Sequence, residues 1–183
     1  MSSDIKGIRR VDASKRAAWK ATLMWWMGGQ LVVSGKRGEA VWRKMVAPID
    51  ARLMRATRGR VRVSFATPTV VLTSIGARSG KRRDTPLTYF TDGDDVILIA
   101  SNYGGERHPG WYHNLLAHPE CELHIGPRGG RFVAREVEGT DRDRLYMLAT
   151  RVTRNYAKYD RTTDGIRTIP VMRLTPAEAA DTT

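Results

Sequence analysis

Residues 73–86 read TSIGARSGKRRDTP and contain the end of one expected strand, a turn and the start of another. The residues that lead into them, 69–75, are mostly β-branched or apolar and favour a strand. Gly76 and Gly80 bound the turn, and a second strand is expected over residues 86–91. The stretch therefore predicts a β-hairpin with a basic tip. Four cationic residues lie at or beside that tip: Arg78, Lys81, Arg82 and Arg83.

Short elements continue from this hairpin to the C-terminus. Further strands are predicted over residues 96–101, 120–125, 131–137 and 169–174, and Asp92-Gly93-Asp94 is a hairpin signal. Apolar residues at helical spacing predict helices over residues 109–118 and 141–156. Antiparallel strands with short helices indicate an α+β fold built on a small β-barrel, not a strand–helix–strand fold.

The first third of the chain has a different composition. Of the 31 Lys and Arg and the 19 Asp and Glu, residues 1–62 hold 15 and 4, which leaves 16 and 15 for residues 63–183. The net charge of +12 is therefore concentrated at the N-terminal end, which argues against a nucleic-acid binder that uses the whole chain. We expect a basic, Trp-rich helical extension over residues 1–60 and the barrel domain over 61–183.

The extension itself is expected to begin with a mobile polar lead, residues 1–12, followed by helices over 13–34 and 39–57. Trp19, Trp25 and Trp26 lie beside Lys15 and Lys20, a combination that suits the surface of a membrane. Packing of these rings on the barrel, or in an oligomer, is an equally open interpretation. The longest apolar stretch, residues 21–33, is shorter than the roughly 20 residues that a spanning helix needs.

The single cysteine, Cys121, excludes an intramolecular disulfide and fits a reducing cytosol. We expect Cys121 to act as a small apolar residue in a strand. No convincing signal peptide begins the sequence. The expected location is the cytoplasm, with contact to the inner face of the plasma membrane as an open alternative.

Two segments could carry chemistry. The turn at 76–83 can bind a phosphate or carboxylate, because arginine donates paired hydrogen bonds to such groups; a solvated basic turn is the alternative. It is not a nucleotide-binding P-loop, because Gly80-Lys81-Arg82 enters a strand and not a helix. Residues 100–114 run from a strand through Gly104-Gly105 into a helix and could hold a flat ring; the alternative is that Trp111 and Tyr112 only cap the core.

Other chemistries find little support in the sequence. His108, His113 and His118 are spaced five residues apart, so they cannot share one helical face, and no metal site is expected. There is no Gly-x-Ser-x-Gly segment to indicate a serine hydrolase.

Taken together, these segments resemble the deazaflavin-dependent nitroreductase family, a branch of the flavin/deazaflavin oxidoreductases found in actinobacteria. The matching pieces are residues 72–73, 76–80, 83–87, 100–105, 109–115 and 167–171, and the resemblance covers roughly residues 68–175. It implies a split β-barrel of the FMN-binding type that holds coenzyme F420, an 8-hydroxy-5-deazaflavin with a phospholactyl-oligoglutamate tail.

The resemblance also assigns roles to residues by position. Ser101 would orient the deazaflavin ring, and Tyr156 and Tyr159 would lie at the substrate pocket as candidate proton donors. The residues implied to bind the cofactor are Ala77, Arg78, Ser79, Arg83, Asp84, Thr85, Pro86, Ile99, Ala100, Ser101, Asn102, Gly110, Trp111, Tyr112, His113 and Asn114.

Some positions depart from the family pattern. Ala77 replaces a usual arginine and Arg78 a usual lysine, which alters the grip on the anion but keeps it cationic. Thr88 stands where some members carry a tyrosine on the substrate side, and Tyr103 stands where glycine is common. These changes affect the expected range of substrates and not the class of cofactor.

The function implied is hydride transfer from reduced F420 to a quinone, an enone or a nitroaromatic compound. A membrane quinone such as menaquinone is the preferred acceptor because of the Trp-rich, basic N-terminus. Charge favours F420 independently, since its tail is polyanionic and FMN would need only one phosphate clamp. The alternatives are an FMN-dependent oxidoreductase on the same fold, a non-catalytic F420-binding protein, and a basic nucleic-acid binder. The oligomeric state is left open.

Overall fold

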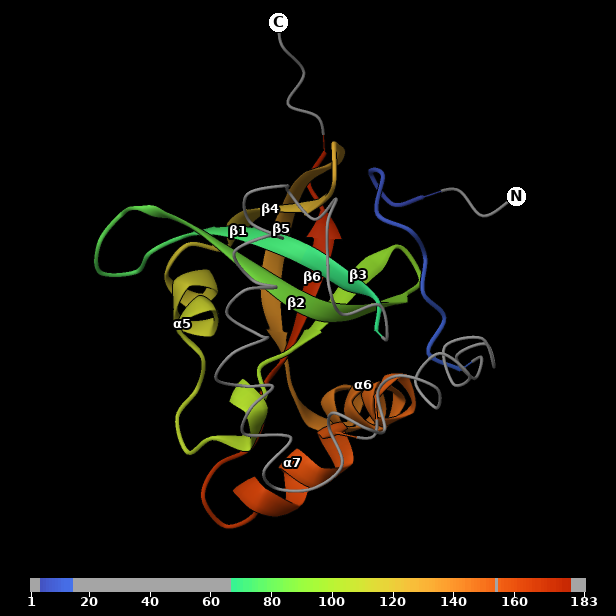
Figure 1. Ribbon diagram of the computed structural model, residues 1–183, viewed down its shortest axis with the longest axis vertical. Helices are drawn as coiled ribbons and strands as arrows, with labels where there is room; N and C mark the ends of the chain where they lie inside the picture. Colours follow the sequence, from blue (N-terminus) through green and yellow to red (C-terminus); the bar gives the residue numbers. More distant parts are fainter. Residues whose placement is uncertain (1–3, 15–66, 154, 179–183) are drawn as a thin grey trace, which may run out of the picture.

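The computed structural model describes residues 4–14, 67–153 and 155–178, and within these ranges it contains a closed six-strand barrel (Figure 1). The strand order around the barrel is β1-β2-β3-β6-β5-β4, and every neighbouring pair is antiparallel. The strands are β1 (Thr69–Ile75), β2 (Arg82–Asp92), β3 (Asp95–Ile99), β4 (Glu120–Ile125), β5 (Arg128–Val137) and β6 (Val171–Pro176). The helices are η3 (Asn102–Gly104), α5 (Gly110–Ala117), α6 (Gly139–Val152) and α7 (Asn155–Thr163). The predicted α+β barrel is confirmed.

Side chains alternate between two cores on either side of the barrel wall, as the two-residue period of a strand requires. In β3, Val96 and Leu98 belong to the core inside the barrel, whereas Ile97 and Ile99 belong to a second core beneath α6 and α7. Phe132 and Leu174 are among the large side chains buried in the first core. Because β3 is buried on both faces, its sequence is a continuous apolar run.

Strand direction brings several connections to one end of the barrel. Since β1 and β3 are both antiparallel to β2, they run in the same direction and end at the same rim. Val171, at the start of β6, pairs with Ile99 at the end of β3 and with Val137 at the end of β5. The β1–β2 turn, the loop after β3, the start of α6 and the segment before β6 therefore all lie toward one end.

The N-terminal segment packs on the barrel, contrary to the prediction that it is mobile. Residues 1–12 were predicted to be mobile, but residues 4–14 pack along the barrel, with Ile5 and Ile8 buried in its inner core. Val11 and Thr91 exchange backbone and side-chain hydrogen bonds, and the Tyr89 hydroxyl donates to the carbonyl of Arg9 at 2.9 Å. The start of the predicted extension thus contributes to the barrel's own core. From residue 15 onward the extension lies outside the described residues, and with it the helix predicted over 39–57 and all but the first two residues of the helix predicted over 13–34.

Several element boundaries also differ from expectation. The helix predicted over 141–156 is two helices, because the backbone at Thr153 is extended and ends α6. Strand β2 starts at Arg82, not at Pro86, since Ile75 still pairs with Arg82. Cys121 is buried in β4, as predicted. No helix in the described ranges has the length and apolar character that crossing a membrane requires.

Candidate functional site

The turn between β1 and β2 uses its own backbone to hold its shape. The N–H of Gly76 donates to the carbonyl of Lys81 at 2.9 Å, and the N–H groups of Ser79 and Gly80 donate to the carbonyl of Gly76. The N–H of Ala77 is also engaged, by Asn114. Few N–H groups remain for a ligand, so an anion at this turn must be bound mainly by side chains.

The cations at the turn differ in what they contact. Arg82 forms an ion pair with Glu122 at 2.9 Å. Arg78, Lys81 and Arg83 are exposed, and within the described residues none of them has an ion-pair or hydrogen-bond partner through its side chain. These three side chains are therefore available to a polyanion.

Asp84, implied to bind the cofactor, has a structural contact instead. Its carboxylate accepts a 2.7 Å hydrogen bond from the Thr73 hydroxyl across the hairpin. An acidic side chain beside an anion is unfavourable, and this bond engages one of its oxygens. A direct contact from Asp84 to the cofactor stays a prediction.

Asn114 joins the basic turn to helix α5. Its side-chain Oδ1 accepts from the N–H of Ala77 at 3.0 Å, and its Nδ2 donates to the Ser74 hydroxyl at 3.2 Å. Both bonds come from one amide, so they fix the position of the turn relative to α5. The basic turn and the segment 100–114 thereby meet on one side of the molecule, as Figure 1 shows for α5 and the β1–β2 hairpin.

The hairpin also extends past the end of β3. β2 pairs with β3 only from Tyr89 to Asp92, whereas its pairing with β1 continues back to Arg82. The part of β2 before Tyr89, including half-buried Thr85 and Pro86, thus overhangs the loop that follows β3. Pro86 suits this position because a proline lacks the N–H that a second neighbouring strand would need.

The loop after β3 has an unusual backbone. Asn102, Tyr103 and Gly104 have φ values of 48°, 55° and 74°, so three successive residues adopt the left-handed conformation. For a residue other than glycine this conformation costs roughly 1–2 kcal/mol. The side chain of Tyr103 is 66% exposed, so the fold recovers little of this cost by burying it.

Arg167, which precedes β6, binds the backbone of this loop through its side chain. Its guanidinium donates to the carbonyl of Ser101 at 2.8 Å and to the carbonyl of Gly105 at 3.0 Å. It also lies 3.1 Å from Nδ1 of His108 and 3.4 Å from the carbonyl of Ala100. One side chain therefore fixes both ends of the left-handed turn.

Burial and the charge of Arg167 lower the pKa of His108. A neutral His108 can accept the Arg167 hydrogen bond at Nδ1, which places its own proton on Nε2.

Gly104 connects the same turn to α7. A Cβ at this position would lie 2.6 Å from the Thr162 hydroxyl and 3.0 Å from the ring of Tyr159. The close approach and the positive φ together require glycine here. The turn is thus seated on α7 as well as held by Arg167.

Tyrosines from two helices gather behind this turn. The rings of Tyr156 and Tyr159 lie 6.2 Å apart in an edge-to-face arrangement, and those of Tyr146 and Tyr156 lie 6.5 Å apart. Burial raises the pKa of Tyr156 well above its usual value, and a hydrogen bond with Thr88 opposes this rise. Tyr156 therefore keeps its proton strongly, whereas Tyr159 is only half-buried.

Other implied cofactor residues have mixed surroundings. Trp111 and Tyr112 are buried in the inner core, and the Tyr112 hydroxyl donates to Glu136 at 2.8 Å, so their rings do cap the core. Ile99 and Ala100 are buried at the end of β3, whereas Asn102, Gly110 and His113 are exposed. Ser101 is half-buried, and within the described residues its hydroxyl has no hydrogen-bond partner.

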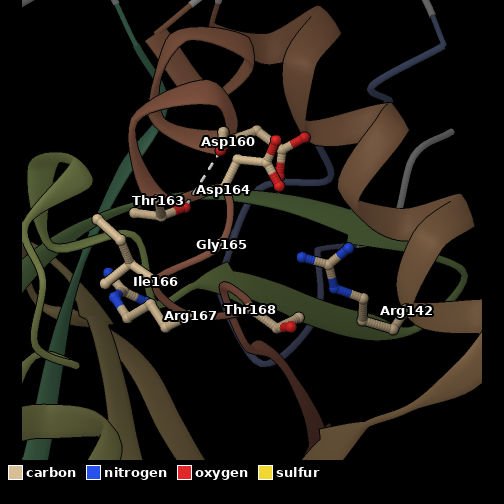
Figure 2. A pocket seen from close by; sticks show the side chains of 8 residues that line it. All are labelled: Arg142, Asp160, Thr163, Asp164, Gly165, Ile166, Arg167 and Thr168. Carbon is tan, nitrogen blue, oxygen red and sulfur yellow. Dashed lines mark hydrogen bonds between the residues drawn. The ribbon is translucent and has the colours of Figure 1, made fainter.

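A hollow of about 360 Å³ lies on the other side of Arg167 (Figure 2). Its lining comes from α6, α7 and the segment before β6: Arg142, Asp160, Thr163, Asp164, Gly165, Ile166, Arg167 and Thr168. No aromatic ring and none of the implied cofactor residues lines it. We therefore regard the convergence of the basic turn, the left-handed loop and the α7 tyrosines as the candidate site.

These residues suit an anionic, flat-ringed molecule. Arg78, Lys81 and Arg83, which have no side-chain partner among the described residues, match a polyanionic tail, and the Ser101 hydroxyl can bond to a polar ring edge. Arg167 is the residue that the sequence interpretation missed as a contributor, although the resemblance included its position. In the described ranges, no three His, Cys, Asp or Glu side chains are grouped to hold a metal ion.

Comparison with known proteins identifies the family. A model of the F420H(2)-dependent quinone reductase family matches residues 47–176. An F420H(2)-dependent quinone reductase from Mycobacterium tuberculosis is 39% identical over 128 residues, which are 67% of this chain and 85% of that protein.

Solved structures agree with the family match. An F420-H2 dependent reductase (FDR-A) has a TM-score of 0.53 and 36% identity, covering 58% of this chain and 93% of that one. A second solved structure, whose description reads only domain-swapped dimer, has a TM-score of 0.55 and 33% identity, covering 72% of this chain and 95% of that one. The barrel, the match to the family model over most of the chain and these relatives show that this chain belongs to the F420H(2)-dependent quinone reductase family, oxidoreductases that use reduced F420.

Proposed function

We propose that this chain reduces a quinone with reduced F420, and that it does so where the basic turn, the left-handed loop and α7 meet. The observation that carries the proposal is that Asn114 accepts a hydrogen bond from the Ala77 N–H and donates one to the Ser74 hydroxyl, which ties the turn to the helix that follows the loop. This link keeps the turn beside the segment 100–114, so that one ligand can contact both. When bound, reduced F420 supplies the hydride.

The protein's part is to bind, orient and supply a proton. We propose that Arg78, Lys81 and Arg83 bind the phosphate and glutamate carboxylates of the tail, and that the Ser101 hydroxyl bonds to the ring. Arg167 keeps Ser101 in place through its carbonyl. We propose Tyr159 as the proton donor to the reduced acceptor, because it is only half-buried, whereas burial raises the pKa of Tyr156 and makes that hydroxyl a weak acid.

The experiment is anaerobic mixing of the protein with reduced F420 and 2-methyl-1,4-naphthoquinone, followed by absorbance of the deazaflavin. We expect the absorbance of oxidised F420 to appear only with protein and quinone together. Persistence of reduced F420 would contradict the proposal. A nitroaromatic compound and an enone, run in parallel, test the wider acceptor range. Reduced FMN in place of F420 tests the FMN-dependent alternative, and F420 binding without turnover would indicate a carrier protein.

The binding role of the basic turn can be tested separately. Removing Arg78 from the turn should weaken F420 binding by about 3- to 10-fold, since an exposed charge-assisted contact is worth roughly 1 kcal/mol. The matched control is Arg151→Ala on α6, which removes an exposed arginine elsewhere. A deazaflavin without the phospholactyl-oligoglutamate tail should bind the wild type and Arg78→Ala alike. Equal losses for both ligands would contradict contact with the tail.

We also propose that the acceptor is a membrane quinone, reached by a cytoplasmic protein through a peripheral contact of residues 13–34. The support is the sequence pattern of Trp19, Trp25 and Trp26 beside Lys15 and Lys20. Sedimentation with vesicles containing anionic lipid is the test. Replacing the three tryptophans with alanine should abolish co-sedimentation and leave reduction of a water-soluble quinone intact. Equal sedimentation of the two proteins would refute this contact.

A further inference from the structure

Tyr103 is a tyrosine at a backbone position that favours glycine, and its side chain is exposed. The backbone at φ 55° favours glycine, and the side chain is 66% exposed, so neither the turn nor the core requires a tyrosine. A residue kept at a cost to the fold, with its ring in solvent, suits contact with a ligand.

The surroundings of Tyr103 fix where its ring can go. Arg167 holds the carbonyls on either side of it, those of Ser101 and Gly105. The next residue, Gly104, is seated against Tyr159 and Thr162 of α7. The backbone on both sides of Tyr103 is therefore held, by Arg167 and by the contact of Gly104 with α7, whereas Tyr103 itself is exposed.

We propose that Tyr103 is a specificity-determining residue whose ring stacks on the quinone acceptor and so favours bicyclic over monocyclic quinones. This inference rests on the proposed function and deepens it. A flat quinone bound between Ser101 and Tyr159 would lie beside Tyr103, which is two residues from Ser101 and adjacent to Gly104, the residue that packs on Tyr159. Stacking scales with the overlapping ring area, and the phenol hydroxyl can donate to a quinone carbonyl.

The test compares wild type, Tyr103→Gly and Tyr103→Phe, with 2-methyl-1,4-naphthoquinone and 1,4-benzoquinone as probes. The control is Lys6→Gly, which removes another side chain from a left-handed residue (φ 47°) in the N-terminal segment. Three quantities are measured: the KM of each quinone with reduced F420, the Kd of the naphthoquinone by equilibrium dialysis with oxidised F420 present, and the melting temperature.

We expect Tyr103→Gly to raise the KM and Kd of the naphthoquinone by about 3- to 10-fold, the range that one aromatic stack provides. The effect on benzoquinone should be smaller, F420 binding unchanged, and the melting temperature equal or higher because glycine relieves the backbone. Tyr103→Phe should retain most of the naphthoquinone affinity of the wild type, and Lys6→Gly should leave the KM of both quinones unchanged.

The outcomes separate this inference from the proposed function. Unchanged KM and Kd in Tyr103→Gly, with normal wild-type turnover, would overturn the role of Tyr103 alone. If wild type binds the naphthoquinone in dialysis but does not turn it over, the proposed function fails, and the Kd of Tyr103→Gly still decides the stacking role. A wild type that neither binds nor turns over the naphthoquinone would overturn both.

Discussion

Replacing Arg167 with lysine tests whether the loop after β3 must be held in place for F420 to bind. Lysine keeps the positive charge but offers one ammonium in place of a planar fork, so it cannot reach the carbonyls of Ser101 and Gly105 together as Arg167 does. The interaction with His108 is also lost or weakened. The change therefore loosens both ends of the left-handed turn without altering the net charge.

The magnitude follows from the two shorter bonds. A hydrogen bond from a charged donor is worth about 1.5–3 kcal/mol, and the partial exposure of Arg167 favours the lower end. Losing one to two of these bonds destabilises the ordered conformation of the loop by about 2–3 kcal/mol. If F420 binds only the ordered loop, its Kd rises by up to roughly 30- to 150-fold. The increase is an upper limit because it assumes that the free loop is only just ordered.

Calorimetric titration with F420, well below the melting temperature of each protein, measures this effect. Arg142→Lys is the matched control, because Arg142 lines the same hollow and donates to the Ile169 carbonyl but does not touch the loop. The control should lower the melting temperature and leave the Kd unchanged. An Arg167→Lys protein that binds F420 within about twofold of wild type would refute the reasoning, because a twofold change is only ~0.4 kcal/mol.

Further predictions concern the hairpin, the thiol and the response to acid. Asn114→Leu removes both bonds to the basic turn and should weaken F420 binding about tenfold with little loss of barrel stability, as measured by titration and urea unfolding. Burial raises the pKa of Cys121 to about 12, so iodoacetamide near neutral pH should label it only in denaturant, as read by intact mass. A hydrogen bond from Arg144 holds the pKa of Asp92 below its ordinary value of 3.8. The ionised Asp92 carboxylate therefore stabilises the fold fully above pH 3.8, and this stabilisation is lost as the pH falls below 3.8 and through the lowered pKa. Urea titrations at a series of acidic pH values should show this loss, and Arg144→Met should reduce it.

The barrel was predictable because its signals are local. β-branched runs mark β1 and β3, and Asp92-Gly93-Asp94 marks the turn between β2 and β3. The break between α6 and α7 could not be predicted, because the sequence has no glycine or proline around Thr153 to mark the end of a helix. Ile5 and Ile8 gave no signal either, because two isolated apolar residues form no periodic pattern.

The same distinction applies to the candidate site. Arg78, Lys81 and Arg83 lie in one contiguous motif, so their clustering could be predicted directly. Arg167 contacts backbone carbonyls more than 60 residues away, with sequence separations of 62 and 66 to Gly105 and Ser101. Backbone carbonyls carry no identity in the sequence, so only the fold could assign this partner.

The N-terminal segment has a practical consequence for work on this protein. A shortened version that starts at the boundary expected near residue 60 would lack Ile5 and Ile8 and leave a gap in the barrel's interior. It would also lose the partner of the Tyr89 hydroxyl. Deleting only the intervening segment, with a flexible tether from Ser14 to Thr67, is the cleaner way to ask what those residues do.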